Sequence, residues 1–225
     1  MKQTVVGIIG GNGVAATNKL LELIEIKYTM DGAFRDAHHP EMLIYQATQA
    51  PSRSMFLEGK GESFIPAYVE AATKLKNAGA DILCMCCNTA HYALDVLRKE
   101  VNIPFVNLIE EVVLKAKQTK LLRFGLVAAD GCLAGKVYEK QFQRIFPEAE
   151  IVYPAEEFQR EVTRGICNIK NSNRFLPEGH PDRPKTIFEK VRQHLIEQGA
   201  EAVIMGCTDI RVDYPPPVTR ALSTH

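Results

Sequence analysis

The sequence lacks a net charge and lacks long apolar runs. Its 27 lysines and arginines balance 27 aspartates and glutamates, so the formal net charge is zero. This balance argues against a broad basic surface for nucleic acid or for an anionic membrane. No apolar stretch approaches the roughly 18–20 residues that are needed to span a bilayer. We therefore expect no nucleic-acid or membrane partner, and a small-molecule substrate whose charge is matched inside a pocket.

The start of the sequence also lacks the features of a signal peptide. Residues 1–4 lead directly into a strand-like segment, without a long apolar region or a small-residue cleavage site. We therefore expect a cytosolic protein, in which thiols stay reduced. Six cysteines are present: Cys84, Cys86, Cys87, Cys132, Cys167 and Cys207. In the cytosol they are expected to be catalytic, metal-binding or buried rather than paired in disulfides.

Two cofactor patterns are incomplete. Cys84 and Cys87 form a C-x-x-C, which a zinc or redox site could use. A structural zinc needs about four ligands, usually two such pairs, and the matching segment of the second half offers only Cys207. The glycine loop at residues 10–13 lacks the full G-x-G-x-x-G pattern of a dinucleotide cradle. We expect neither a metal nor a nucleotide cofactor.

Short apolar runs alternate with segments of helical periodicity. This alternation predicts an α/β fold, with a parallel sheet covered by helices on both faces. The expected strands are residues 5–9, 41–47, 81–85, 103–106, 124–128, 150–153 and 202–205. The expected helices are residues 14–28, 63–77, 88–99, 109–117, 132–145, 156–166 and 184–198.

An internal repeat divides the chain. Residues 6–13 resemble residues 124–131, and residues 78–87 resemble residues 198–207 at nearly the same offset. We infer two similar parallel-sheet domains related by pseudo-symmetry. Their expected ranges are 1–118, carrying Cys87, and 119–225, carrying Cys207, with a tail that could return to the first domain. The active site is expected in the cleft between them.

Cys87 and Cys207 each follow the end of a predicted strand, where open α/β sheets bind ligands. Two halves that face each other would place these thiols on opposite walls of one cleft. A cysteine near a helix N-terminus is favoured as a thiolate, which is a base, and its thiol is an acid. Racemisation needs this pair, since one group removes the α-proton and the other returns a proton to the opposite face.

The residues beside the two cysteines are polar. Asn88 and Thr89 follow Cys87, and Thr208 follows Cys207. They could donate hydrogen bonds to a substrate carboxylate, or they could simply cap the helices that follow.

These segments resemble the aspartate/glutamate racemase family. The resemblance rests on an ordered set of motifs that runs from residue 7 to about residue 210: Cys87-Asn88-Thr89-Ala90-His91, Gly206-Cys207-Thr208-Asp209-Ile210, the glycine loop with Asn12, Pro51-Ser52-Arg53, and Arg164 to Lys170.

The resemblance implies a two-domain α/β fold, activity without pyridoxal phosphate or metal, and a homodimer. It implies that Cys207 takes the proton from the L-enantiomer and Cys87 from the D-enantiomer, and that Asn12 belongs to the substrate-binding residues. It also implies that Arg53 and Lys170 bind a second substrate carboxylate by charge-assisted hydrogen bonds. The alternative for these two cations is solvated surface charge.

Three positions depart from the family pattern. Cys132 replaces a threonine, which could remove a substrate-contacting hydroxyl and place a thiol in the pocket. Asp209 replaces a glutamate and is one methylene shorter, which could alter a bond behind Cys207 or to the substrate amine. The tail after Asp213 contains three consecutive prolines, which cannot form a helix interior.

The function expected from these observations is cofactor-independent racemisation of an acidic amino acid, aspartate or glutamate. The alternatives are a maleate cis-trans isomerase or hydantoin racemase of related fold, and a catalytically impaired ligand-binding relative. A thiol redox protein would depend on Cys84 and Cys87 but not on Cys207.

Overall fold

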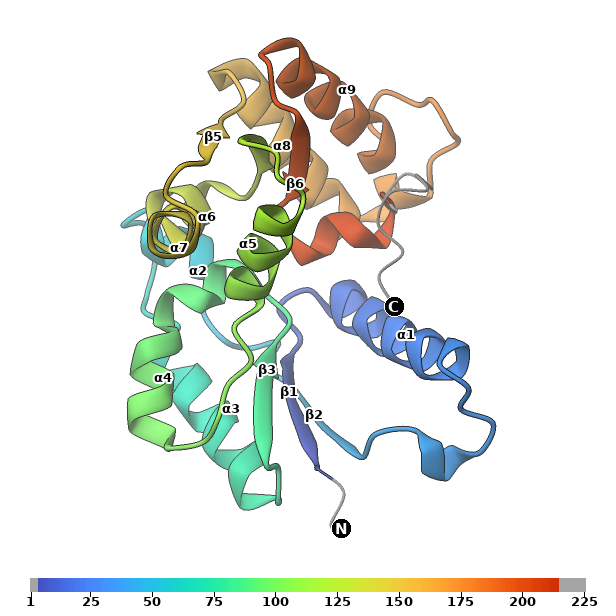
Figure 1. The fold of residues 1–225 in the computed structure, drawn as a ribbon, viewed down its shortest axis with the longest axis vertical. Coiled ribbons are helices and arrows are strands. Elements are labelled where there is room, and N and C mark those ends of the chain that lie inside the picture. Colours follow the sequence, from blue (N-terminus) through green and yellow to red (C-terminus); the bar gives the residue numbers. More distant parts are fainter. Residues whose placement is uncertain (1–3, 215–225) are drawn as a thin grey trace.

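The computed structural model describes residues 4–214, which form two halves built around separate parallel sheets (Figure 1). The first sheet has the strand order β2-β1-β3, from β1 (Val6–Gly10), β2 (Met42–Gln46) and β3 (Ile82–Met85). The second has the order β5-β4-β6, from β4 (Arg123–Val127), β5 (Glu150–Val152) and β6 (Ala202–Met205). Each half therefore places its first strand in the centre, and the expected α/β fold in two similar halves is confirmed.

The repeat in the sequence corresponds to equivalent turns in the two halves. Gly79 follows α3 (Ile65–Asn77) with φ 104°, and Gly199 follows α9 (Pro184–Glu197) with φ 90°. Side chains with a Cβ rarely adopt such values, so glycine allows each helix to turn directly into the next strand. The strands β3 and β6 begin three residues after these glycines.

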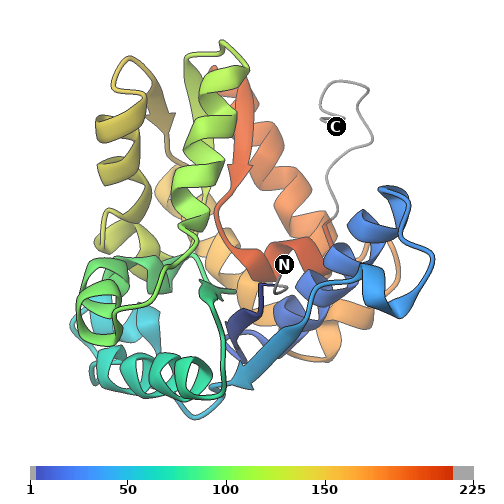
Figure 2. The same cartoon turned by 60° about the horizontal axis from the view of Figure 1, so that its bottom comes forward.

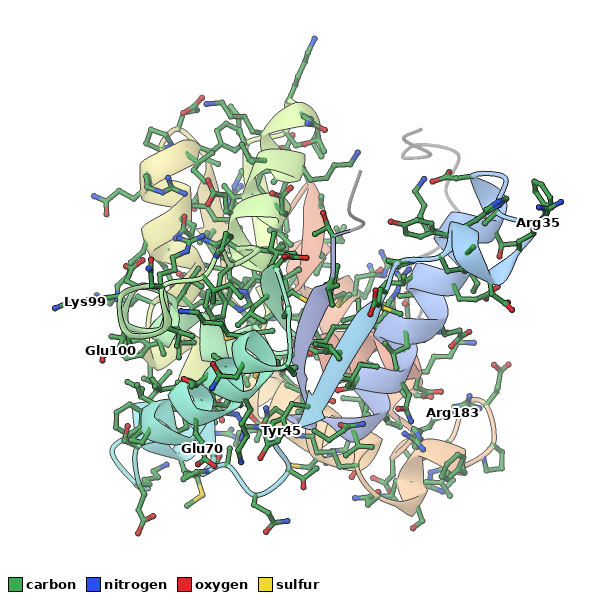
Figure 3. The ribbon with its side chains drawn as sticks, turned by 90° about the horizontal axis from the view of Figure 1, so that it is seen from below. Arg35, Tyr45, Glu70, Lys99, Glu100 and Arg183 are labelled. Atoms are coloured by element: carbon green, nitrogen blue, oxygen red, sulfur yellow. The ribbon has the colours of Figure 1, made fainter. Side chains whose placement is uncertain are left out.

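Helices cover the first sheet on both sides. α1 (Val14–Met30) lies on one side, and α3 with α4 (Leu94–Val101) lies on the other (Figures 1 and 2). Ile9 and Leu83 are fully buried in the core that α3 and α4 form. Polar side chains face outward from these helices, and Figure 3 labels Glu70 on α3 and Lys99 and Glu100 on α4. The remaining elements of this half are α2 (Arg53–Leu57) and the 3-10 helices η1 (Asp36–His38) and η2 (Thr89–Ala93).

The second sheet separates two hydrophobic clusters. One contains α5 (Leu108–Gln118) and α7 (Val137–Ile145), with Phe124 of β4 between them. The other contains α8 (Glu156–Ile169) and α9. Helix α5 ends at residue 118 but packs against α7 and β4 of the second half. The domain boundary at residue 118 stays a prediction. The remaining elements are α6 (Asp130–Ala134), η3 (Ser172–Phe175) and η4 (Thr208–Val212).

The halves touch on both flanks of the space between them. On one flank Gly131 of α6 donates its N–H to Ser54 Oγ of α2 at 2.8 Å. On the other, Thr208 of η4 donates its hydroxyl to the carbonyl of Cys86 at 3.3 Å. Asn88 Nδ2 also donates to the Tyr138 hydroxyl of α7 at 3.2 Å.

Three expected elements differ in the structure. The helix expected over 88–99 begins as the 3-10 helix η2 and becomes α-helical only from Leu94, in α4. Residues 103–106 do not form a strand. Phe105 makes a single parallel bridge to Leu83, because the chain turns into α5 directly afterwards. The helix expected over 132–145 is interrupted by Lys136, whose φ of 50° is left-handed, and therefore divides into α6 and α7. The proline-rich tail lies outside the described residues. Over residues 4–214, none of the helices combines the length and the apolar character that crossing a bilayer requires.

Candidate active site

A cavity of about 300 Å³ lies between the halves, and both contribute to its wall. Nine of the ten residues expected at the site line it: Asn12, Arg53, Cys87, Asn88, Thr89, Lys170, Cys207, Thr208 and Asp209. A wider cavity of about 810 Å³ adjoins it and shares Asn12, Arg53, Lys170 and Asp209. Residues separated by almost 200 positions in the chain thus meet in one pocket.

The two cysteines occupy equivalent places in the two halves. Cys87 lies two residues after the end of β3, and Cys207 lies two residues after the end of β6. Cys87 is buried and Cys207 is partly buried, and both are free thiols. Parallel strands present the following loops at their carboxyl ends, so two facing sheets bring both thiols to one cavity.

The environment of Cys207 favours the thiol form. Burial raises the pKa of Cys207 far above its ordinary value of 9.0, and the nearby carboxylate of Asp209 and sulfur of Cys87 add to the rise. The backbone N–H of Asp209 and the ammonium of Lys170 oppose it but do not outweigh burial. Cys207 is therefore favoured as a neutral thiol at neutral pH. The helix that follows it, η4, is a five-residue 3-10 helix and cannot supply the dipole of a long α-helix.

Polar groups adjoin each thiol. The amide of Asn88 is held through Nδ2 by Tyr138, and its Oδ1 is buried without a hydrogen-bond partner among the described residues. Thr89 is 7% exposed, while the Thr208 hydroxyl proton is engaged by the Cys86 carbonyl. The N-cap role considered for Asn88 is not seen, because its side chain makes no capping bond.

A basic side of the cavity is formed by Arg53 and Lys170. Arg53 donates from Nη1 to the carbonyl of Pro51 at 3.0 Å, and its buried Nε has no partner within residues 4–214. Lys170 lies 3.1 Å from the carboxylate of Asp209, measured from Nζ to Oδ2. Burial lowers the pKa of Lys170, but the Asp209 carboxylate outweighs it, so the pKa is raised and the ammonium stays charged.

Asn12 is fixed in the glycine loop that precedes α1. Its Nδ2 donates to the carbonyl of Gly10 at 3.1 Å. Gly13 has φ 121°, and a Cβ at this position would lie 1.8 Å from Asp209 Oδ1. Glycine is thus required here both by the backbone conformation and by the close approach of Asp209.

Cys132 lies behind the cavity wall rather than in it. It is 1% exposed and is not one of the lining residues. Burial raises its pKa to about 12, the charge of Cys87 adds to this, and a hydrogen bond with Thr89 opposes it. Cys132 therefore contacts Thr89, which lines the cavity, and does not itself reach the cavity.

His91 acts on Cys87 through the backbone. Its Nε2 accepts from the N–H of Leu108 at 3.2 Å, so Nδ1 carries the proton and donates to the Cys87 carbonyl at 2.9 Å. Burial lowers the pKa of His91 to about 4, so the ring is neutral at neutral pH.

Sequence reasoning did not identify several residues at the site. Asp130, Thr163 and Glu58 also line the cavity. The buried hydroxyl of Tyr68 lies beside Cys87 without lining the cavity, and its pKa is raised well above 10.0 by burial and then by the charge of Cys87. The position of Asp130 three residues after the end of β4 was the available signal, because this segment is the repeat equivalent of the glycine loop.

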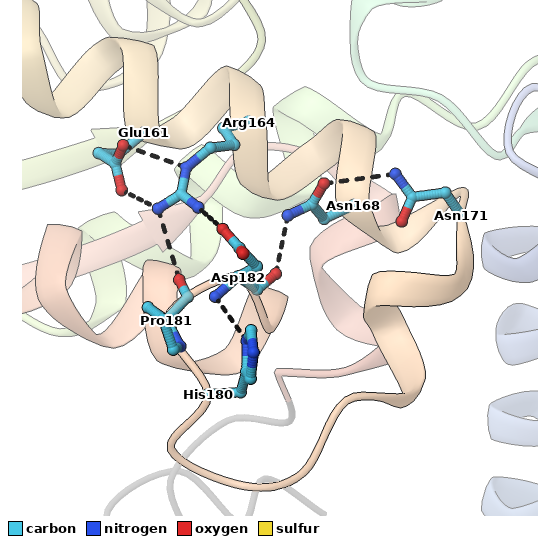
Figure 4. Close-up of polar contacts among 7 residues, drawn as sticks. All are labelled: Glu161, Arg164, Asn168, Asn171, His180, Pro181 and Asp182. Atoms are coloured by element: carbon cyan, nitrogen blue, oxygen red, sulfur yellow. Dashed lines mark hydrogen bonds and ion pairs between the residues drawn. The ribbon is translucent and has the colours of Figure 1, made fainter.

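A polar network holds the end of α8 that carries Lys170 (Figure 4). Arg164 bonds to Glu161 and to Asp182 of the following loop. Asn168 Nδ2 donates to the Asp182 carbonyl at 2.7 Å and Asn171 Nδ2 donates to Asn168 Oδ1 at 3.3 Å. The loop is thereby fastened to α8 immediately beside the site.

Comparison with known proteins agrees with this architecture. The profile of the Asp/Glu/Hydantoin racemase family matches residues 9–224. A broad specificity amino-acid racemase of Bacillus subtilis is 23% identical over 208 residues, which cover 92% of this chain and 86% of the relative. A glutamate racemase of a Picosynechococcus species is 29% identical over 76% of this chain but only 57% of its own length.

Solved structures show the same fold. An aspartate racemase of Picrophilus torridus superposes with a TM-score of 0.77 at 24% identity, covering 93% of this chain and 83% of that one. A putative Asp/Glu racemase of Yersinia pestis gives 0.71 at 19% identity, covering 95% and 90%. The chain belongs to the Asp/Glu/Hydantoin racemase family. It is an isomerase of the amino-acid racemase class.

Proposed function

We propose that this protein racemises an acidic amino acid, aspartate or glutamate, by proton transfer between Cys87, Cys207 and the substrate α-carbon. The observation that carries the proposal is the equivalent placement of the two thiols, each two residues beyond a strand, at one cavity between two similar halves. Two groups on opposite walls can act on opposite faces of one carbon. A single base would tend to return the proton to the face from which it came.

The proton transfers balance without a further reactant. In the L-to-D direction the thiolate of Cys207 takes the α-proton, forming an S–H bond, and the C–H electrons move into the α-carboxylate. The Cys87 thiol then gives its proton to the opposite face of the carbanion and becomes a thiolate. In the D-to-L direction the roles are exchanged, and there Cys207 donates from the thiol form that burial favours. Because the thiols supply both steps, we propose that no pyridoxal phosphate or metal takes part.

The remaining lining residues would bind the carboxylates. The N–H and hydroxyl groups near Asn88, Thr89 and Thr208 would stabilise the charge that develops on the α-carboxylate. Arg53 and Lys170 would bind the side-chain carboxylate, with Asn12 beside them. The unpartnered buried atoms Arg53 Nε and Asn88 Oδ1 support a polar ligand, because buried polar groups normally find partners. A homodimer and a cytosolic location stay predictions.

The test is deuterium incorporation from solvent at the α-carbon of L- and D-aspartate and L- and D-glutamate, followed by NMR without added cofactor. We expect exchange with inversion in the wild type, and loss of racemisation in Cys87→Ser and in Cys207→Ser. Cys84→Ala is the control, since Cys84 lies on β3 and does not line the cavity. Loss of activity in Cys84→Ala with retention in Cys207→Ser would indicate thiol redox chemistry, and no exchange from any of the four substrates would contradict the proposal.

A further inference from the structure

The candidate site has an acidic wall that the two-thiol reaction does not use. Asp130 lines the cavity at the start of α6, three residues after the end of β4. Its carboxylate is held in place by α8: Gln159 Nε2 donates to Oδ1 at 2.7 Å, and the Thr163 hydroxyl donates to Oδ2 at 2.8 Å. Two neutral donors from adjacent turns of one helix thus fix the orientation of a charged group at a pocket.

The other carboxylates of the cavity have ionic partners inside the protein. Lys170 pairs with Asp209, and Glu58 pairs with Lys60 at 2.9 Å while accepting from Ser54 at 2.7 Å. Asp130 differs, because within the described part of the chain it forms no salt bridge. The Lys60 ammonium is influenced by the charge of Asp130, but its hydrogen bond goes to Glu58.

An amino acid carries a cation that no group assigned so far receives. Its α-carboxylate and side-chain carboxylate have donors at Asn88, Thr89 and the Arg53–Lys170 side. Its ammonium needs an anionic acceptor. Asp209 is the less suitable one, because Oδ2 pairs with Lys170 and Oδ1, which is buried and has no hydrogen-bond partner among the described residues, lies against Gly13. Each oxygen of Asp130 accepts one bond and retains a further lone pair.

We propose that Asp130 binds the α-ammonium of the substrate; this rests on the function proposed above. Binding there directs the ammonium toward the second half of the protein, while Arg53 and Lys170 hold the side-chain carboxylate at the side shared with the wider cavity. Three charged substituents then have three separate partners, which fixes the orientation of the α-carbon between the thiols. Asp130 thus selects amino acids over dicarboxylates of the same length.

The test compares L-aspartate with succinate, which has the two carboxylates but no ammonium. Binding of both is measured by titration calorimetry to the wild type and to Asp130→Asn, which keeps the size of the side chain. We expect Asp130→Asn to weaken aspartate binding at least about tenfold, because a charge-assisted bond is lost. Succinate binding is expected to stay equal or to become tighter. If Asp130→Asn does not fold, Asp130→Ser carries the same expectation.

Glu58→Gln is the matched control, because it removes a negative charge from the same cavity wall. A wild type that binds neither ligand would contradict the acidic-amino-acid function itself. A wild type that binds both, with an unchanged aspartate-to-succinate ratio in Asp130→Asn, would overturn the role of Asp130 alone. An equal change of the aspartate-to-succinate ratio in Glu58→Gln would also overturn the role of Asp130. The overall negative charge of the cavity, and not a direct contact with Asp130, would then explain the preference.

Discussion

Lys170 at the end of α8 and Asp209 in η4 form an ion pair at the wall of the candidate site, with 3.1 Å between Nζ and Oδ2. The Asp209 side chain is 5% exposed, whereas the Lys170 side chain is 50% exposed. The pair therefore joins a buried anion to a cation that reaches the cavity. Both groups act on Cys207, and they act in opposite directions.

The charges of this pair shift the pKa of Cys207 in addition to the larger effect of burial. In Asp209→Asn the carboxylate that raises the Cys207 pKa is lost, so the thiolate fraction at pH 9 should increase. In Lys170→Met the ammonium that lowers the pKa is lost, so the thiolate fraction should decrease. The rate of Cys207 alkylation by iodoacetamide, followed by peptide mass spectrometry, measures both changes. Slower alkylation in both variants would contradict the opposite effects of Asp209 and Lys170 on the Cys207 pKa.

Gly131 is needed for the contact between α2 and α6. A Cβ there would lie 2.3 Å from Ser54 Cα and 2.8 Å from the Ser54 carbonyl oxygen, which are backbone atoms. Alanine favours a helix over glycine, but the steric conflict should outweigh this, and we expect Gly131→Ala to lower the free energy of unfolding by about 1–3 kcal/mol. Urea denaturation measures the effect.

Gly135→Ala is the control, because the nearest atom to its added Cβ is the mobile end of Leu57, at 2.9 Å. Its effect should be clearly smaller. Equal losses in the two variants would show that glycine flexibility, and not the approach of Ser54, determines stability here.

Burial of neutral His91 makes stability depend on pH. Its folded-state pKa of about 4 lies below the ordinary 6.5, so the unfolded chain binds this proton more readily. The stability that the neutral ring contributes is complete above pH 6.5 and is lost as pH falls toward 4. The loss amounts to roughly 3 kcal/mol.

Urea denaturation between pH 7 and pH 4.5 tests this. Carboxyl groups whose pKa is lowered in the folded protein, such as those of Glu161 and Glu201, titrate below that pH range. The slope of unfolding free energy against pH should be flatter in His91→Gln than in the wild type. An unchanged slope would assign the pH dependence to other groups.

The Tyr138 hydroxyl orients Asn88. In Tyr138→Phe the buried Asn88 Nδ2 loses its acceptor, which should cost about 1 kcal/mol or more of stability and should raise KM for the amino acid. Tyr153→Phe is the control: its hydroxyl bonds to Glu139 at 2.9 Å, but the residue is 41% exposed, so its effect should be small. Steady-state kinetics measure KM and thermal denaturation measures stability in both variants. Equal effects in Tyr138→Phe and Tyr153→Phe would contradict the role of Tyr138.

The sequence was sufficient to predict the elements that follow clear periodicity. The strands near residues 5–9 and 202–205 and the helix over 184–198 lie within a residue or two of their predicted bounds. The helix over 132–145 could not be predicted correctly, because Lys136 adopts a left-handed conformation that lysine does not favour. The prediction of a strand at 103–106 was wrong. The apolar residues beside Pro104 form one bridge to Leu83, and the chain then begins α5.

For the candidate site, the repeat was sufficient to bring Cys87 and Cys207 to one cavity, because symmetry-related strand ends face each other. The partners of the charged groups could not be predicted in the same way. The bond from Thr163 to Asp130 spans 33 positions, and the approach of Asp209 to Gly13 joins opposite ends of the chain. Such contacts follow from how the halves pack, which no local pattern in the sequence records.

The bonds from Gly131 to Ser54 and from Thr208 to Cys86 fasten the halves on both flanks of the cavity. Large rotation of one half against the other would break them. Binding should therefore cost little conformational entropy in the backbone, and association should follow a single kinetic phase without a slow closing step. A pocket of preset width would also limit how far a bound ligand can shift between the thiols of Cys87 and Cys207.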